Sequence, residues 1–329
     1  MHDPAAVLRS SPSDLGASPI RRLYDPDMAA RYKNLVYDSA RWDGFAFRDD
    51  DILICTPAKC GTTWMQMICA LLVFGPPPFP ISLDLISPWM DMLLRDRASV
   101  IADLDAQTHR RFIKTHTPLD GLPWDDRVTY LCVGRDPRDV GMSWDNHMAN
   151  MDMEVFMNAR ASVAGLDDVA DLLAAGPPPM PESPLDRFWM WTEYPLDAPA
   201  ASLASTLAHL ETFWAVRDRS NVIMIRYEDL KNDLEGSMRM LAARLGIDVR
   251  EDSWPTLVEA ATFDSMRSRA TELVPNSTSK LWHNNDQFFH HGTTGQWRGL
   301  LDKESDARYQ ARAATLASPE LLDWLHQPT

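Results

Sequence analysis

The segment from Thr56 to Trp64, which reads TPAKCGTTW, holds the residues best suited to chemistry in this sequence. It follows a short apolar run and precedes a stretch with helical spacing, so it predicts a tight turn between a strand and a helix. The N-terminus of a helix binds anions, because its backbone N–H groups are free and the helix dipole is positive there. The turn adds a positive charge, a glycine that permits close approach, two hydroxyl donors and a flat ring, from Lys59, Gly61, Thr62, Thr63 and Trp64. The sequence lacks GxxxxGK[ST], so this is not a standard ATP-binding P-loop, and a plain strand–helix turn with an exposed lysine is the alternative.

Two further apolar runs also end in polar residues that could act on a ligand. Lys114 and His116 close one of them, and a histidine has a pKa near neutrality that suits a general base. Arg135 follows the other and can bind a phosphate with two parallel hydrogen bonds, and Ser143 can join it. Taken singly, the histidine could be structural and the RDPRD segment a surface cluster of salt bridges.

The apolar runs alternate with amphipathic stretches, which predicts an α/β fold with a mainly parallel sheet flanked by helices. We expect strands at 51–56, 111–115, 128–133 and 221–227, and helices at 62–74, 208–217 and 234–245. Ser318 can cap a final helix with Pro319 at its first position. We expect one domain over residues 1–329, with an N-terminal extension at 1–34 and an acceptor-site lid or insertion at 148–205.

Composition excludes several classes of protein. The 329 residues carry 32 Lys and Arg against 47 Asp and Glu, a net charge of −15, which argues against general nucleic-acid binding. The four cysteines form no metal spacing, and we expect reduced thiols, two of them in buried strands at Cys55 and Cys132. No run predicts a signal peptide, a membrane span or a metal-binding carboxylate cluster. We therefore expect a cytoplasmic protein without a metal.

Taken together, the motifs resemble those of the cytosolic-type sulfotransferases. The signatures of that family are approximately TYPKSGTTW, KTH and RxPxDxxxS, which here read TPAKCGTTW, Lys114-Thr115-His116 and RDPRDVGMS. A later signature close to RKGxxGxWK reads HHGTTGQWR at 290–298, and RYEDL at 226–230 looks like the family's YED segment. The matches keep the family's order from residue 35 to residue 300. The middle and the end of the chain also resemble, more loosely, actinobacterial glycolipid sulfotransferases.

The resemblance implies transfer of a sulfuryl group from PAPS (3'-phosphoadenosine-5'-phosphosulfate) to an acceptor hydroxyl, with PAP as the product. It makes His116 the general base, while Lys59 and Lys114 stabilise the charge on the transferring group. In the donor site, Arg135 and Ser143 would hold the 3'-phosphate. The full set of donor-binding residues that it implies is Lys59, Cys60, Gly61, Thr62, Thr63, Trp64, Arg135, Ser143, Tyr227, Thr262, Phe263, Met266, His290, His291 and Gly292.

Two positions depart from the family pattern. Cys60 stands where a serine is usual, and a thiol beside Lys59 at a helix N-terminus is expected to have a lowered pKa and raised reactivity, with an inert buried thiol as the alternative. His290 and His291 replace an Arg-Lys pair, so they would hold a phosphate best when protonated. The family's KxxxTVxxxE dimer signature is not found, which leaves the oligomeric state open.

The acceptor is less constrained. Trp89, Met90, Met92 and the methionine-rich stretch 148–157 could wall an apolar pocket, although core packing explains any one of them. Phenols, sterols, lipids and glycolipids all fit such a wall. Two rival functions are a nucleotide or small-molecule kinase, which metal-dependent activity would reveal, and a nucleotide-binding module that has lost its activity.

Overall fold

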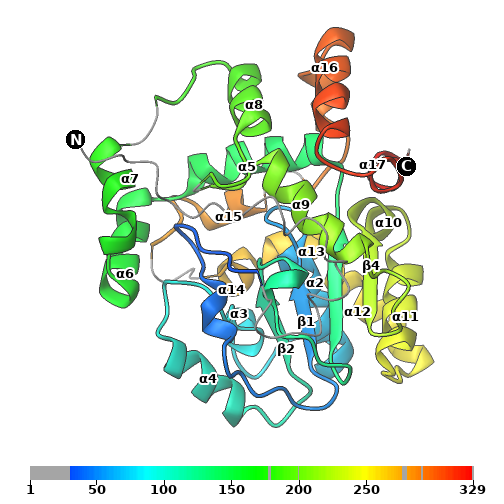
Figure 1. The fold of residues 1–329 in the computed structure, drawn as a ribbon. Coiled ribbons are helices and arrows are strands. Elements are labelled where there is room, and N and C mark those ends of the chain that lie inside the picture. Colours follow the sequence, from blue (N-terminus) through cyan, green and yellow to red (C-terminus); the bar gives the residue numbers. More distant parts are fainter. Residues whose placement is uncertain (1–29, 177–178, 199, 276–279, 290–291, 328–329) are drawn as a thin grey trace.

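A parallel four-stranded sheet forms the centre of the described chain (Figure 1). The computed structural model describes residues 30–176, 179–198, 200–275, 280–289 and 292–327. The strand order is β2-β1-β3-β4, with β1 at Ile52–Cys55, β2 at Phe112–Thr115, β3 at Thr129–Gly134 and β4 at Val222–Arg226. Ile52 pairs with Phe112 on one side and Thr129 on the other, and Tyr130 pairs with Val222. All four carboxyl ends therefore meet at one edge.

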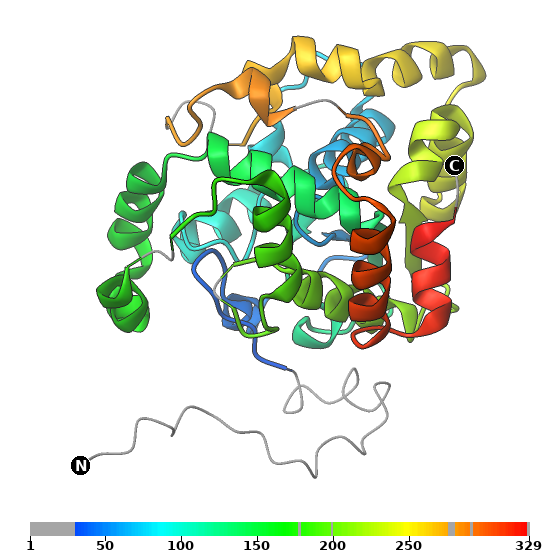
Figure 2. The same cartoon turned by 90° about the horizontal axis from the view of Figure 1, so that it is seen from above.

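Helices cover both faces of this sheet (Figure 2). They are α2 (Thr62–Phe74), α3 (Leu83–Ile86), α4 (Arg97–Ala106), α5 (Pro137–Asn150), α6 (Met153–Ala164), α7 (Ala170–Ala175), α8 (Pro184–Glu193), α9 (Leu203–Trp214), α10 (Tyr227–Asn232), α11 (Leu234–Leu245), α12 (Trp254–Ala261), α13 (Phe263–Ser268), α14 (Ala270–Leu273), α15 (Asn285–Phe288), α16 (Lys303–Ala314) and α17 (Pro319–His326). Short 3-10 helices lie at Ser39–Trp42, Leu119–Gly121, Asp167–Val169, Glu251–Ser253 and Gln296–Gly299.

The side chains on the two faces of the sheet pack into two separate parts of the hydrophobic core. Ile52 and Ile54 of β1 pack with residues of α2, α11 and α12, whereas Leu53 and Cys55 pack with residues of α9 and α17. Successive side chains of a strand point to opposite faces, and every residue of β1 is buried. Strands buried on both faces read as continuous apolar runs, which is why DILICT was recognisable in the sequence.

The predicted α/β class is confirmed, and several elements match closely. The helices α2 and α11 have the expected bounds, and Gly246 ends α11 in the left-handed conformation with a φ of 65°. Cys55 and Cys132 are free and buried in strands, as expected. The helix α9 begins five residues before the predicted start, because Ser202 and Ser205 form a reciprocal capping box that the prediction overlooked.

The methionine-rich stretch after α5 leaves the sheet region. The helices α6 and α7 lie to one side of the sheet in Figure 1, and α8 returns the chain toward α9. Among the residues that the structure describes, no helix combines the length and the apolar character that crossing a membrane requires.

Candidate active site

One cavity of about 780 Å³ opens at the carboxyl edge of the sheet and gathers most of the predicted site. Parallel α/β sheets bind ligands at this edge, where loops and helix N-termini converge. The predicted residues that line it are Lys59, Gly61, Thr62, Thr63, Trp64, Lys114, His116, Arg135, Ser143, Tyr227, Phe263, Met266 and Gly292. Most of them come from the ends of the four strands and from the turns and helices that follow, whereas Phe263 and Met266 come from α13 and Gly292 from a later loop.

The turn between β1 and α2 has the sharp geometry expected of an anion-binding loop. Gly61 precedes α2 with a φ of 101°, a conformation that favours glycine. A Cβ added there would lie 2.9 Å from the ring of Tyr227, so both backbone and space require glycine. Trp64 lies edge-on to the same tyrosine and donates its indole N–H to the Ala261 carbonyl at 2.8 Å. The first turn of α2 is therefore held open toward the cavity.

Three cations, Lys59, Lys114 and Arg135, converge on the cavity. Arg135 donates to the carbonyls of Lys59 and Thr293, at 3.0 and 3.3 Å, and its guanidinium lies 4.4 Å from the Tyr227 ring centre. Lys114 has its ammonium 4.1 Å above the ring of Trp89. In the part of the chain that the structure describes, no carboxylate forms an ion pair with Lys59, Lys114 or Arg135, and the buried Nε of Arg135 has no hydrogen-bond partner. Such a cluster suits an anion with several charges.

Burial lowers the pKa values of both lysines. Burial, followed by the charges of Arg135 and Lys114, lowers the pKa of Lys59 to about 7. Burial lowers the pKa of Lys114 to about 8, against the opposing effect of Asp91 and Asp84. A bound anion would raise both values, since an opposite charge favours the protonated form.

His116 follows β2 and faces the cavity as a neutral imidazole. Its Nδ1 is hydrogen-bonded to the Thr56 carbonyl oxygen, and its ring meets Trp89 edge-on at 4.4 Å. Burial, followed by the charge of Lys114, holds the pKa of His116 well below its usual range. A carbonyl only accepts, so Nδ1 carries the proton and Nε2 has the free lone pair that a general base needs.

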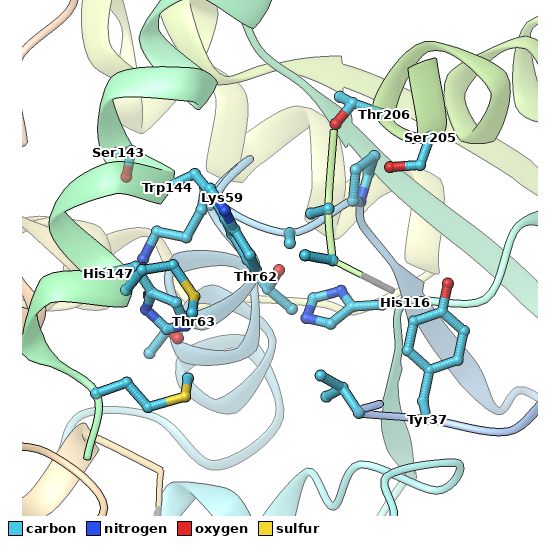
Figure 3. A pocket seen from close by; sticks show the side chains of 18 of the residues that line it. Tyr37, Lys59, Thr62, Thr63, His116, Ser143, Trp144, His147, Ser205 and Thr206 are labelled. Atoms are coloured by element: carbon cyan, nitrogen blue, oxygen red, sulfur yellow. Dashed lines mark hydrogen bonds between the residues drawn. The ribbon is translucent and has the colours of Figure 1, made fainter. Parts of the chain in front are cut away.

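A second histidine, His147, belongs to the cavity and was missed in the sequence. It lies on α5 four residues after Ser143, and Figure 3 shows both side chains entering from α5 while His116 enters from the opposite side. Lys59 Nζ lies 3.3 Å from His147 Nδ1. Burial holds the pKa of His147 well below its usual range. Helical spacing from Ser143 was the signal that could have found it.

Two predicted donor residues do not line the cavity. The thiol of Cys60 is fully buried in the core beneath the loop, and burial raises its pKa to about 12, so the expected low pKa was wrong. Thr262 caps α13 instead: its hydroxyl accepts from Ser265 N–H at 3.3 Å and donates to the Glu259 carbonyl at 2.8 Å. His290 and His291 lie outside the described residues.

The wall opposite the anion loop is largely apolar. Trp89 and Met92 line it as proposed, whereas Met90 is wholly buried in the core. Met148 contributes from the last turn of α5, and Met151, Met153, Phe156 and Leu196 contribute from the stretch after it. Residues 31–37 also line the cavity, although the sequence placed most of them in an N-terminal extension. Their short polar and apolar mixture gave no signal of this role.

Among the described residues, no three His, Cys, Asp or Glu side chains lie close enough together to hold a metal ion.

Comparison with known proteins identifies the family of this chain. Residues 49–318 match the family described as "Sulfotransferase domain". This chain belongs to that sulfotransferase family. The membership confirms the prediction made from the three motifs.

Curated relatives of this sulfotransferase extend over nearly its whole length. A "Glycolipid sulfotransferase" of Mycobacterium bovis is 41% identical over 311 residues, which cover 90% of this chain and 94% of the relative. A protein with the same name from Mycobacterium tuberculosis is 40% identical over the same lengths. "Sulfotransferase 1A1" of Rattus norvegicus is 25% identical over 80% of this chain and 84% of the relative. The resemblance to actinobacterial glycolipid sulfotransferases is therefore confirmed.

Solved structures support the same fold. Mouse sulfotransferase SULT7A1, complexed with PAP, superposes with a TM-score of 0.64 at 19% identity, covering 89% of this chain and 93% of that chain. A retinol dehydratase, in complex with androsterone and PAP, gives a TM-score of 0.62 at 19% identity over 86% of this chain and 89% of that chain.

Proposed function

We propose that this sulfotransferase moves a sulfuryl group from PAPS to the hydroxyl of an apolar small molecule, a lipid or a glycolipid, with His116 as the general base. One observation carries the proposal: Lys59, Lys114 and Arg135, which form no ion pair with any described carboxylate, share a cavity with a neutral histidine. Such a site suits an anionic donor and an acceptor that must lose a proton.

The size of the cavity and its charged residues support PAPS as the donor. Its volume of about 780 Å³ lies within the usual range for sites that bind small molecules. Arg135 and Ser143 would hold the 3'-phosphate, and the unpartnered Nε of Arg135 is one group that awaits an acceptor. Lys59 and the turn to Trp64 would hold the 5'-phosphosulfate. Trp64, Tyr227, Phe263, Met266 and Gly292 would enclose the adenine, and the two solved relatives that contain PAP support this choice of donor.

The chemistry follows from the tautomer of His116. Its Nε2 takes the proton of the acceptor hydroxyl while the acceptor oxygen forms a bond to sulfur. The bond between that sulfur and the 5'-phosphate oxygen of PAPS breaks, which leaves PAP and a sulfate ester. Lys59 and Lys114 stabilise the negative charge on the sulfuryl oxygens and on the leaving oxygen, and fixed charges in a water-poor site are effective in this role.

The acceptor would lie against the apolar wall. Met148, Met151 and Phe156 come from the stretch 148–205, which we propose as the acceptor-side part of the chain. Methionine adapts to ligands of irregular shape, so this wall suits an apolar alcohol. The names of the mycobacterial relatives favour a glycolipid among such acceptors. The cytoplasmic location and the lack of a nucleic-acid partner stay predictions from the sequence.

Incubation with sulfur-labelled PAPS and a panel of phenols, sterols, lipids and glycolipids tests the activity and identifies the acceptor. Replacing His116 with Ala is expected to lower kcat by about 10²–10⁴-fold, the usual contribution of a positioned general base. Binding of PAP is expected to stay the same, because the imidazole serves the acceptor. His283→Ala is the matched control, since that histidine is exposed and does not line the cavity.

The outcomes are distinct. Label transfer that falls with His116→Ala and not with His283→Ala supports the proposal. An active parent enzyme whose His116→Ala variant retains its kcat would assign the base elsewhere. A parent enzyme that transfers label to no acceptor and binds no PAP would overturn the proposed function.

A further inference from the structure

A buried carboxylate outside the motifs, that of Asp91, lies beneath the proposed catalytic residues. It is wholly buried and accepts four hydrogen bonds. Its Oδ1 accepts from Trp89 Nε1 at 2.6 Å, and its Oδ2 accepts from Trp42 Nε1 at 3.0 Å, Thr115 Oγ1 at 2.5 Å and Thr117 Oγ1 at 2.6 Å. Buried carboxylates without an ion pair are rare and require such a shell.

The directions of these bonds are fixed by the partners. The two indole N–H groups can only donate. The hydroxyl of Thr115 accepts the backbone N–H of Thr117 at 2.9 Å, so its own hydrogen is free to point at Asp91. The shell therefore suits the ionised carboxylate, whose two oxygens only accept.

Each hydrogen-bond donor to Asp91 except Trp42 also contacts a proposed catalytic residue or adjoins one in the chain. The ring of Trp89 meets His116 edge-on at 4.4 Å and lies 4.1 Å from the ammonium of Lys114. Thr115 and Thr117 flank His116 in the chain. The backbone joins the same residues, because Lys114 N–H donates to the Pro88 carbonyl at 3.0 Å and Trp89 forms a parallel bridge with Lys114.

We propose that Asp91 is a positioning residue that fixes His116 and Lys114 through Trp89, Thr115 and Thr117. The inference rests on the catalytic roles proposed above and adds the group that holds them. Through its four hydrogen bonds, the Asp91 carboxylate fixes the residues on both sides of His116. It also fixes the ring of Trp89, which packs against His116. Displacements of about 1 Å in a reacting group can cost about 10²-fold in rate, so a rigid anchor of this kind matters for turnover.

The anchor also acts through its charge. Asp91 and Asp84 both raise the pKa of Lys114, whereas burial lowers it. The other titratable groups that interact with this lysine are Lys59, His116 and His147. Removing the charge of Asp91 leaves Lys114 with one carboxylate fewer nearby. Lys114 then loses its proton at lower pH, and kcat falls at lower pH as well.

The experiment compares Asp91→Asn with the parent enzyme. An amide of the same shape keeps one acceptor oxygen and turns two donors toward the shell, so we expect kcat to fall by about 10–100-fold. The alkaline limb of the kcat–pH profile should move to lower pH, while the Kd of PAP changes less than twofold. Asp51→Asn is the control: Asp51 is also buried, but it pairs with Arg111 at the opposite end of β1 and should alter stability without moving this limb.

A second pair of variants keeps the test decisive if Asp91→Asn does not fold. Thr117→Val removes one donor at nearly constant shape, and Thr117→Ser retains it, so the valine variant should lose kcat and the serine variant should recover it. An active parent enzyme in which Asp91→Asn keeps its kcat and its pH profile, or in which valine and serine behave alike, would overturn the inference. A parent enzyme without sulfuryl transfer would instead overturn the proposed function.

Discussion

At the scale of single residues, the site depends on groups held in uncommon protonation states. Lys59 and Lys114 have lowered pKa values chiefly because they are buried, and the charge of Arg135 adds to the effect at Lys59. His116 stays neutral for the same reason. The shifted pKa values of these groups thus suit the cavity to an anion and to proton abstraction.

The affinity for PAP should depend on pH through Lys59. The pKa of this lysine is lowered to about 7, and a bound phosphate raises it, so binding takes up a proton above that value. Affinity should be full below pH 7 and should decline as pH climbs toward 9. Calorimetric titration in buffers of different ionisation enthalpy measures both the decline and the proton uptake. Lys59→Arg, which stays charged, should flatten the dependence; an equal slope in both proteins would contradict this prediction.

Cys60 should be inert toward alkylation. Its thiol is buried in the core, and a pKa of about 12 leaves almost no thiolate at neutral pH. Iodoacetamide followed by peptide mapping should find the same low labelling of Cys60 with and without PAP. Strong labelling that PAP prevents would instead restore the expectation drawn from the sequence. That expectation failed because helix position and a neighbouring lysine were visible in the sequence, whereas burial was not.

At the scale of elements, the strand–turn–helix unit from β1 to α2 carries the donor site. Gly61→Ala should lower the free energy of unfolding by about 1–3 kcal/mol, because its φ of 101° is strained for alanine. It should also weaken PAP binding, since the new Cβ would push against Tyr227 at 2.9 Å. Gly246→Ala is the control, with a φ of 65°, open space around it and a place far from the cavity at the end of α11. Chemical denaturation and PAP titration separate the two effects, and equal PAP affinities in both variants would contradict the role of the contact.

The sequence predicted this unit well and the opposite wall poorly, for physical reasons. Apolar runs and helix periodicity are local, so β1, α2 and α11 could be placed within a residue or two. The contributions of residues 31–37, Asp91 and His147 arise from contacts between distant segments. Local patterns do not record such contacts; only for His147 could the four-residue spacing from Ser143 have given a signal.

At the scale of the whole molecule, the chain carries a strongly negative net charge, whereas its main cavity contains a cluster of cationic side chains. The net charge is −15, yet the cavity holds Lys59, Lys114 and Arg135 without an ion pair among the described residues. Long-range repulsion by the acidic surface is screened within about 8 Å at physiological salt. Local desolvation and hydrogen bonding therefore decide what this cavity binds.

PAP should consequently stabilise the fold, because its proposed site uses residues from several strand ends, which come together only in the folded chain. At about 100 times the Kd, the gain should be roughly 2.7 kcal/mol. For a chain of this size such a gain raises Tm by several degrees. Thermal melts with PAP, with and without EDTA, measure this rise in Tm. Adenosine, which lacks phosphates, is the matched control. It should shift Tm far less, because it brings no anion to the three cations. A shift that disappears with EDTA would mean that a metal ion holds the phosphates, and the absence of any shift would mean that the cations at the strand ends do not form a donor site.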